Sequence, residues 1–320
     1  MCVKGYGLRG RNLGMLTMKN ALIAAIVLIA GLTSPVVAQD RVTLGWGRLF
    51  NNDAMGDSQD RWRTGSYTFS RLRGVSWSGV LPEQPGAILE YRVRGETIAP
   101  DNLLVPDPTD RRYAGALSFG VHTHFGWRGN ELSLGGDLVM TGPQTGIGRF
   151  QSWVHDQLGL DEPQVLDGQI GNGIHPTLVA EMGRSMRFGT STTLRPFVEA
   201  RAGAETLVRI GGDLVIGEFG QGDLMLRDPT TGQRYRGIAG VHDTGFSLVL
   251  GADVAQVFSS VFLPADEAVT LSDTRSRARA GVQWQGSRAS GFYGVTYLGP
   301  EFNEQKEGQF VGSLNVNFSF

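Results

Sequence analysis

Residues 310–320 end the chain with the sequence FVGSLNVNFSF, which alternates between two kinds of side chain. One set is apolar or glycine: Phe310, Gly312, Leu314, Val316, Phe318 and Phe320. The other set is mainly small and polar: Val311, Ser313, Asn315, Asn317 and Ser319. Successive side chains of a strand point to opposite faces, so the segment predicts a strand between two different environments. A strand of a membrane β-barrel has this pattern, with its apolar face toward lipid and its polar face toward the lumen.

Similar alternating segments run through the chain, separated by Gly, Pro, Asp and Asn. They predict strands near 41–50, 64–77, 87–95, 112–127, 130–140, 175–187, 191–203, 205–217, 244–260, 267–284, 288–298 and 308–320. Twelve is an even number, as a single-chain bacterial barrel requires. The expected fold class is therefore all-β, a twelve-stranded antiparallel transmembrane β-barrel. A soluble β-sandwich is disfavoured because the segments offer no second apolar face for an inner sheet.

The composition excludes several classes of protein. The 320 residues include 29 Lys+Arg and 31 Asp+Glu, without the basic excess of nucleic-acid-binding proteins. The mean hydropathy of -0.12 excludes a membrane protein built from many apolar helices, whereas a barrel exposes only alternate residues to lipid. Glycine, at 46 residues, is about twice as frequent as usual, which fits many turns and bends.

The first forty residues predict an export signal. Lys19 precedes an apolar run at 21–32, and Val36 and Ala38 follow it at the spacing of a cleavage site. These features are typical of a secretory signal peptide over residues 1–38, and the run is short for the alternative, an anchoring helix. The exported domain, residues 39–320, then contains no cysteine, because the one cysteine is Cys2. This excludes a disulfide scaffold and a cysteine nucleophile.

One predicted connection is long for a barrel. Residues 141–173 separate the fifth and sixth strands, and some of them recur at helical spacing: Ile147, Phe150, Gln151, Val154, His155 and Leu158. Gly146 and Gly159 bound this run, so we predict a short helix from about 147 to 158 in an extracellular loop. A helix in a barrel loop is unusual enough to suggest that it positions functional side chains.

His155 is the candidate general base. Gln151 precedes it by one helical turn and lies on the same face. An imidazole has a pKa near neutral pH, so it can accept a proton from water, although the position of His155 alone does not decide for catalysis. His122 and His124 lie on one face of a predicted strand, and we interpret them as barrel-lining rather than metal-binding because no third ligand is nearby in sequence.

Oxygen-bearing side chains lie where the first two predicted strands approach each other. Asn52 and Asp53 follow the first strand, and Thr64 begins the second. Amide, carboxylate and hydroxyl oxygens are ligands that calcium accepts. Asn and Asp also collect in ordinary hairpin loops, so composition alone leaves both readings open.

Several short motifs follow one another along the chain. They are Asn52-Asp53, the pattern D-x-x-x-T-G at 60–65, DRRYAG at 110–115, Gly142-Pro143, Q-x-x-x-H at 151–155, GPEF at 299–302 and GSL at 312–314. In this order the motifs resemble those of the outer-membrane lipid A 3'-O-deacylase family. The resemblance spans residues from about 42 to 320. Each motif is short, and their order and spacing make the set specific.

The resemblance implies a fold and an activity. Members of that family are twelve-stranded outer-membrane barrels that remove the 3'-linked acyloxyacyl group of lipid A and depend on calcium. Their active site lies between the barrel wall and a loop helix near the outer surface. The family's site residues match His155, Gln151, Asn52, Asp53 and Thr64. The resemblance therefore implies a monomer in the bacterial outer membrane, with lipopolysaccharide in the outer leaflet as its partner.

This set of residues implies a mechanism. His155 takes a proton from water, which attacks the ester carbonyl, while calcium held by Asp53, with Asn52 or Thr64, stabilises the oxyanion. Arginine side chains suit the phosphate groups of lipid A as bidentate partners. The candidates for substrate binding are Arg61, Arg63, Arg111 and Arg112.

Two alternatives remain open. At least some family members use a lysine in the loop between the third and fourth strands, whereas residues 100–105 here read PDNLLV. The main alternative is therefore a catalytically decayed barrel of the same family with a structural or transport role. The second is a phospholipase-type barrel, for which Ser152 is too close to His155 in sequence to be a convincing partner.

Overall fold

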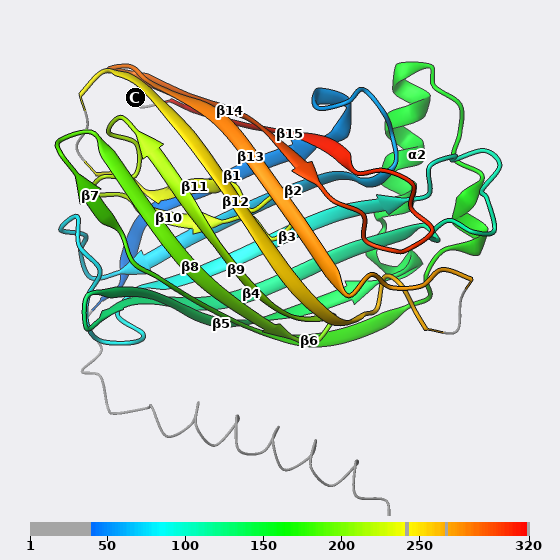
Figure 1. Ribbon diagram of the computed structural model, residues 1–320, viewed down its shortest axis with the longest axis horizontal. Helices are drawn as coiled ribbons and strands as arrows, with labels where there is room; N and C mark the ends of the chain where they lie inside the picture. Colours follow the sequence, from blue (N-terminus) through cyan, green and yellow to red (C-terminus); the bar gives the residue numbers. More distant parts are fainter. Residues whose placement is uncertain (1–39, 241–242, 266–267, 319–320) are drawn as a thin grey trace, which may run out of the picture. The chain divides into compact units, whose positions relative to one another are not determined.

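Twelve long strands form a closed antiparallel barrel in the computed structural model, which describes residues 40–240, 243–265 and 268–318 (Figure 1). The strands are β1 (Val42–Asn52), β2 (Trp62–Gly74), β3 (Leu89–Ala99), β4 (Ala114–Trp127), β5 (Asn130–Thr141), β6 (Gly173–Gly183), β8 (Thr192–Ala202), β9 (Glu205–Ile216), β12 (Gly245–Ser260), β13 (Thr274–Gln285), β14 (Ala289–Leu298) and β15 (Gln309–Phe318). This confirms the predicted fold class. The predicted signal peptide, residues 1–38, lies outside the described residues.

The barrel closes through pairing of its first and last strands. β1 pairs with β15 over a short stretch, with Phe50 opposite Leu314 and Asn52 opposite Gly312. Elsewhere neighbours in sequence pair, except that β9 pairs with β12 across an insertion and β6 pairs with β8. A short strand, β7 (Met186–Phe188), continues beyond the end of β6 and also pairs with β8.

The two faces of the last strand separate as the alternation predicts. Val311 and Ser313 are buried, whereas Phe310, Leu314 and Val316 are exposed. Side chains of a strand alternate between its faces, so the polar set faces the lumen and the apolar set faces outward. Among the described residues, no helix is long and apolar enough to cross a membrane.

The predicted strands agree with the observed ones to within a few residues, with one exception. The tenth strand was expected from residue 267, but β13 begins at Thr274. Residues 266 and 267 lie outside the described residues, and of the residues that follow, Val269 packs with Trp62, Leu263 and Phe302. Apolar alternation in this segment therefore reflects a packed loop rather than a strand.

The long loop contains the predicted helix. Helix α2 (Ile147–Leu158) has the predicted bounds, and Gly146 and Gly159 flank it in the left-handed backbone conformation. Glycine adopts that conformation without steric cost, which explains both positions. Three short 3-10 helices, η1 (Asp53–Met55), η2 (Pro143–Thr145) and η3 (Val165–Gly168), lie in loops at the same end of the barrel, which we call the α2 end. In bacterial barrels the longer loops face the cell exterior.

A hairpin between β9 and β12 was missed by the sequence prediction. It consists of β10 (Leu224–Arg227) and β11 (Arg234–Ile238), and Figure 1 shows it toward the end of the barrel opposite α2. The hairpin packs against the inner face of β1. A Cβ atom on Gly45 would lie 2.2 Å from the carbonyl oxygen of Gly237, so this close approach requires glycine.

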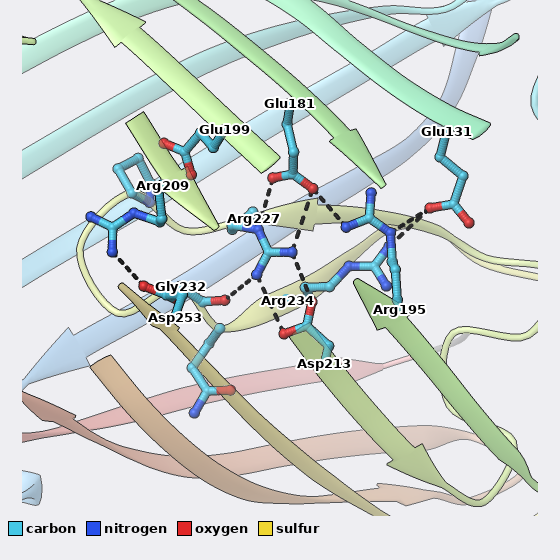
Figure 2. Close-up of polar contacts among 12 residues, drawn as sticks. Glu131, Glu181, Arg195, Glu199, Arg209, Asp213, Arg227, Gly232, Arg234 and Asp253 are labelled. Carbon is cyan, nitrogen blue, oxygen red and sulfur yellow. Dashed lines mark hydrogen bonds and ion pairs between the residues drawn. The ribbon is translucent and has the colours of Figure 1, made fainter. Parts of the chain in front are cut away.

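The hairpin brings charged side chains into the lumen. Figure 2 shows Arg227 of β10 between Glu181 of β6 and Asp213 of β9, at 2.7 Å from each carboxylate. A third carboxylate, Asp253, contacts Arg209, Arg277 and Arg279. These buried charges neutralise one another, so the lumen is filled by a network of ion pairs. Beside the network lies an apolar cluster in which Leu226 and Tyr235 of the hairpin pack with the inward-facing Leu49 and Leu72.

Candidate active site

Helix α2 packs against the outer face of the barrel wall. The side chain of Ile147 lies over Gly95 of β3 and Gly115 of β4, where an added Cβ would come within 3.3 and 2.8 Å of it. Gly95 belongs to the same outward row of β3 as Tyr91 and Val93, which are exposed. Small residues in the wall thus let the helix approach closely, and the helix holds its buried side chains outside the lumen.

His155 lies in the last turn of α2, on the face that is buried. Its Nδ1 atom lies 2.7 Å from the carbonyl oxygen of Asp161. A carbonyl only accepts hydrogen bonds, so Nδ1 must carry a proton and donate it there. The other nitrogen, Nε2, is thereby directed into the site, 3.0 Å from Oδ2 of Asp60. A hydrogen bond at this second contact needs a further proton, on Nε2 or on the carboxyl group of Asp60. His155 and Asp60 are therefore suited to acid–base chemistry.

Asp60 connects the side chains of the site. Its Oδ1 accepts hydrogen bonds from Oγ1 of Thr64 at 2.6 Å and from Nε2 of Gln151 at 3.4 Å. Its Oδ2 faces His155. The sequence prediction did not include Asp60 among the site residues, although it opens the D-x-x-x-T-G pattern, and that position was the available signal.

Asp53 lies in η1 and is 1% exposed. Its Oδ2 accepts hydrogen bonds from Oγ1 of Thr64 at 2.9 Å and from the backbone N–H of Arg61 at 2.8 Å. Burial nevertheless raises the pKa of Asp53 to about 8, and the nearby Asp60 and Asp57 carboxylates raise it as well. The folded chain therefore surrounds this carboxyl group with too little positive charge to keep it ionised easily.

The Thr64 hydroxyl lies between two carboxyl groups, those of Asp53 and Asp60. A hydroxyl group has a single hydrogen, so it donates to only one of them at a time. The other contact then needs a proton on the carboxyl group, and the raised pKa of Asp53 fits that role. The two Thr64 contacts and the raised pKa of Asp53 therefore both favour a proton on one of these carboxyl groups.

Asn52 has a different environment from the other predicted site residues. Its Oδ1 accepts the backbone N–H of Ala54 at 2.9 Å, and its Nδ2 donates to the carbonyl oxygen of Thr64 at 3.2 Å. The side chain thus caps η1 and ties it to β2. The structure brings Asp53, Thr64, Gln151 and His155 together through Asp60, and Asn52 holds the backbone beside them.

The donor set of this region fits a hard cation. Asp53 and Asp60 offer carboxylate oxygens, and Asn52 and Thr64 offer amide and hydroxyl oxygens, which suits calcium rather than zinc. Within the described ranges, no group of three or more His, Cys, Asp or Glu side chains is placed to hold a metal ion. A bound ion would therefore need neutral oxygen ligands as well.

The structure divides the four predicted phosphate-binding arginines into two groups. Arg63 and Arg111 are buried in the lumen, where they pair with Glu301 at 2.9 and 2.5 Å. Their position disagrees with the expectation that they bind lipid phosphates, because carboxylates already engage them away from the outer wall. Arg61 lies at the rim and pairs with exposed carboxylates, and Arg112 is exposed.

The other two predicted histidines line the barrel. Nε2 of His122 lies 3.1 Å from Asp137, and Nε2 of His124 lies 2.9 Å from Glu90. Each imidazole thus has its own carboxylate partner on the inner face. Both side chains therefore line the barrel, as the interpretation of the pair predicts.

The sequence and the fold match known proteins. The model of a family described as outer membrane protein LpxR matches residues 22–320. The structure of LpxR from Salmonella typhimurium is 16% identical in sequence, is matched over 86% of this chain and 100% of that chain, and has a TM-score of 0.71. The translocator domain of the autotransporter NalP from Neisseria meningitidis is 12% identical, over 95% and 99% of the two chains, with a TM-score of 0.40. No curated protein matches the sequence.

Proposed function

Because the chain belongs to the family of the outer membrane protein LpxR, we propose that it is a calcium-dependent lipid A 3'-O-deacylase. The fold and the family support an outer-membrane barrel related to lipid A. The proposal adds the reaction, hydrolysis of the 3'-linked acyloxyacyl ester, and the residues that perform it. The substrate is lipid A of lipopolysaccharide in the outer leaflet.

The position of the site is the observation that carries this proposal. His155, Asp60 and Thr64 form a hydrogen-bonded set between the barrel wall and a helix packed on its outer face. A membrane lipid that diffuses in the leaflet reaches such a site from the side, without entering the lumen. A transported solute would instead meet the ion pairs and the hairpin inside the barrel.

The side chains have the chemistry that ester hydrolysis needs. Nε2 of His155 accepts a proton from water as the water oxygen bonds to the ester carbonyl carbon, and later returns it to the departing 3' oxygen. The carbonyl oxygen of Asp161 orients the imidazole at Nδ1, and Asp60, which contacts Nε2, must give up that contact before water can donate a proton there. Oε1 of Gln151 is buried without a protein partner and can accept a hydrogen bond from water or substrate. Calcium bound by Asp53, with Asn52, Thr64 or Asp60, would supply positive charge for the oxyanion.

Mass spectrometry of lipid A tests the proposal. The chain is produced in bacteria whose lipid A retains its 3' acyloxyacyl group, and lipid A is also treated with the purified barrel, with calcium or with a chelator. We expect loss of that group with calcium, and a decrease in rate of about 100-fold or more for His155→Gln, the usual contribution of a general base.

The matched control is Asp156→Asn, which changes an exposed carboxylate adjacent to His155 in the same helix. We expect this variant to keep the wild-type rate. If the folded wild-type barrel leaves lipid A unchanged in the presence of calcium, the deacylase proposal is wrong. The decayed barrel of the same family would then be the better explanation, and residues 100–105, with no lysine, would be the first place to seek the cause.

A further inference from the structure

We propose that one side of helix α2 is inserted into the hydrocarbon of the outer leaflet. This side, which we call the apolar edge, consists of Phe150, Trp153 and Leu158. The proposal names a lipid surface as the partner of the helix. It stands apart from the proposed hydrolysis, because a barrel without catalytic activity would insert the same edge.

The helix has three sides with different environments. Gly148, Gln151 and His155 form the buried side, toward the wall and the site. Arg149 and Asp156 are exposed and charged, and they lie together at a spacing of seven residues. The apolar edge lies on the remaining arc, where Trp153 is next to Arg149, Leu158 is next to the buried side, and the exposed Gln157 lies between Trp153 and Phe150.

The apolar edge is strongly exposed in the barrel on its own. Phe150, Trp153 and Leu158 are 60, 57 and 68% exposed, and the rings of Phe150 and Trp153 stack with centroids 5.8 Å apart. Two stacked aromatic rings and a leucine form an exposed apolar patch, and such patches mark interaction surfaces. The rest of the described chain leaves more than half of each of these side chains exposed.

The edge continues the lipid-facing surface of the barrel. Ile147 begins the apolar row of the helix and contacts the wall at Gly95 and Gly115. Phe150 follows it at the next turn of that row. Below the contact, the outward rows of the same two strands carry exposed Val93 and Phe119. One apolar surface therefore runs from the barrel wall onto the helix. Lipid covers the part of this surface on the wall, so lipid also lies next to the part on the helix.

The distribution of aromatic residues supports the same occupant. Membrane barrels carry aromatic girdles where their walls meet the two interfaces. At the α2 end, exposed phenylalanines of other strands supply such residues: Phe50, Phe258 and Phe310. The outward positions nearest this end on the two strands that the helix contacts, β3 and β4, carry none: Gly95, Thr97, Gly115 and Leu117. Tyr113, just before β4, is buried against the helix and is not exposed to lipid. Phe150 and Trp153 fill that gap in the girdle.

Spin labels on single cysteines test the insertion. Cys2 is replaced by serine, and one cysteine is introduced in the full chain at Phe150 or Trp153, or at the charged positions Arg149 or Asp156 as matched controls. Val93→Cys gives a reference on the lipid-facing wall. Each labelled protein is placed in vesicles of phosphatidylethanolamine and phosphatidylglycerol. Power-saturation spectra are then recorded with oxygen, which partitions into hydrocarbon, and with a water-soluble nickel complex.

We expect labels at Phe150 and Trp153 to show the behaviour of Val93, with high oxygen and low nickel accessibility. Labels at Arg149 and Asp156 should show at least a several-fold higher ratio of nickel to oxygen accessibility. Equal nickel accessibility at all four helix positions, with the Val93 label still protected, would overturn the proposal. Protection at Val93 shows that the barrel is inserted, so misfolding cannot produce that result.

Discussion

The lumen and the outer-wall site use buried carboxylates in opposite ways. In the lumen, Asp253 contacts three guanidinium groups. At the site, the buried Asp53 has the Thr64 hydroxyl and a backbone N–H as its partners, and two other carboxylates, Asp57 and Asp60, lie near enough to raise its pKa. One carboxylate is neutralised by its neighbours, and the other is not.

This difference separates structural charges from candidate functional ones. A buried ion pair with its full set of partners holds strands in place and needs nothing else. A buried carboxyl group with a perturbed pKa and too little compensating charge is costly to the fold, so it is a better indication of a bound cation or proton transfer. The three predictions that follow test this contrast by changing one region at a time.

The largest expected effect is the pH dependence caused by Asp53. Its pKa rises from 3.8 in the unfolded chain to about 8 in the folded one, so the folded state holds a proton that the unfolded state loses. The free energy of unfolding should therefore fall as pH rises from about 4 to 8, at up to about 1.4 kcal/mol per unit in calcium-free buffer. Asp53→Asn should remove this contribution, be more stable than wild type at pH 8, and lose activity.

Denaturant unfolding at several pH values, in detergent with a chelator, measures this effect. Asp167→Asn, at an exposed loop position, is the control and should follow the wild-type pH dependence. If Asp53→Asn is less stable than wild type at pH 8, then Asp53 is neutralised in the fold as the lumen carboxylates are, and the contrast between the regions disappears.

The next effect is in the lumen, where Asp253→Asn should destabilise the fold, whereas Asp53→Asn should stabilise it at pH 8. Asp253→Asn leaves Arg209, Arg277 and Arg279 without their common negative partner. Breaking a buried pair in this way lowers the free energy of unfolding by about 3–5 kcal/mol. Denaturant unfolding at pH 7 measures the loss, again with Asp167→Asn as the neutral control. Unchanged stability would mean that water, rather than Asp253, neutralises these arginines.

The smallest effect concerns the hairpin that fills the lumen. Gly45→Ala places a Cβ atom against the backbone of Gly237, so we expect a loss of about 1–3 kcal/mol from overpacking. Gly245→Ala is the matched control, because no atom lies within 4 Å of an added Cβ there. Thermal unfolding measures the stability of both variants and of the wild type. Equal stability would show that the hairpin can move away from β1 at little cost.

The strands were predictable from the sequence because a membrane barrel imposes a period of two on every strand. β15 is the clearest case, since its polar set faces the lumen and its apolar set faces outward. The helix was equally predictable, because Gly146 and Gly159 mark its ends and no strand pattern competes between them. The hairpin of β10 and β11 has a weaker signal, because its strands are only 4 and 5 residues long and the apolar side chains that they bury in the lumen, such as Leu226 and Tyr235, are few.

The site was only partly predictable, and a local irregularity explains much of the rest. Counting back in twos from the exposed Tyr67 places Arg63 on the outer face. The register of β2 with β3 shifts between Trp62 and Gly65, and Arg63 instead lies in the lumen with Glu301. A bulge reverses the alternation, and alternation alone cannot reveal it. Asp60 was missed for a different reason, because it lies in a loop whose contacts depend on tertiary structure.

The seam between β1 and β15 links the site to the order of assembly. The segment that carries Asp53 is fastened to strands from the other end of the chain, since Asp57 accepts the backbone N–H of Phe310 and Met55 accepts the hydroxyl of Tyr293. The backbone around Asp53 is therefore fully held only when the last strands to be synthesised have joined the first. A chain still in transit, with its ends apart, lacks these contacts, so closure of the barrel completes the region that we propose as the active site.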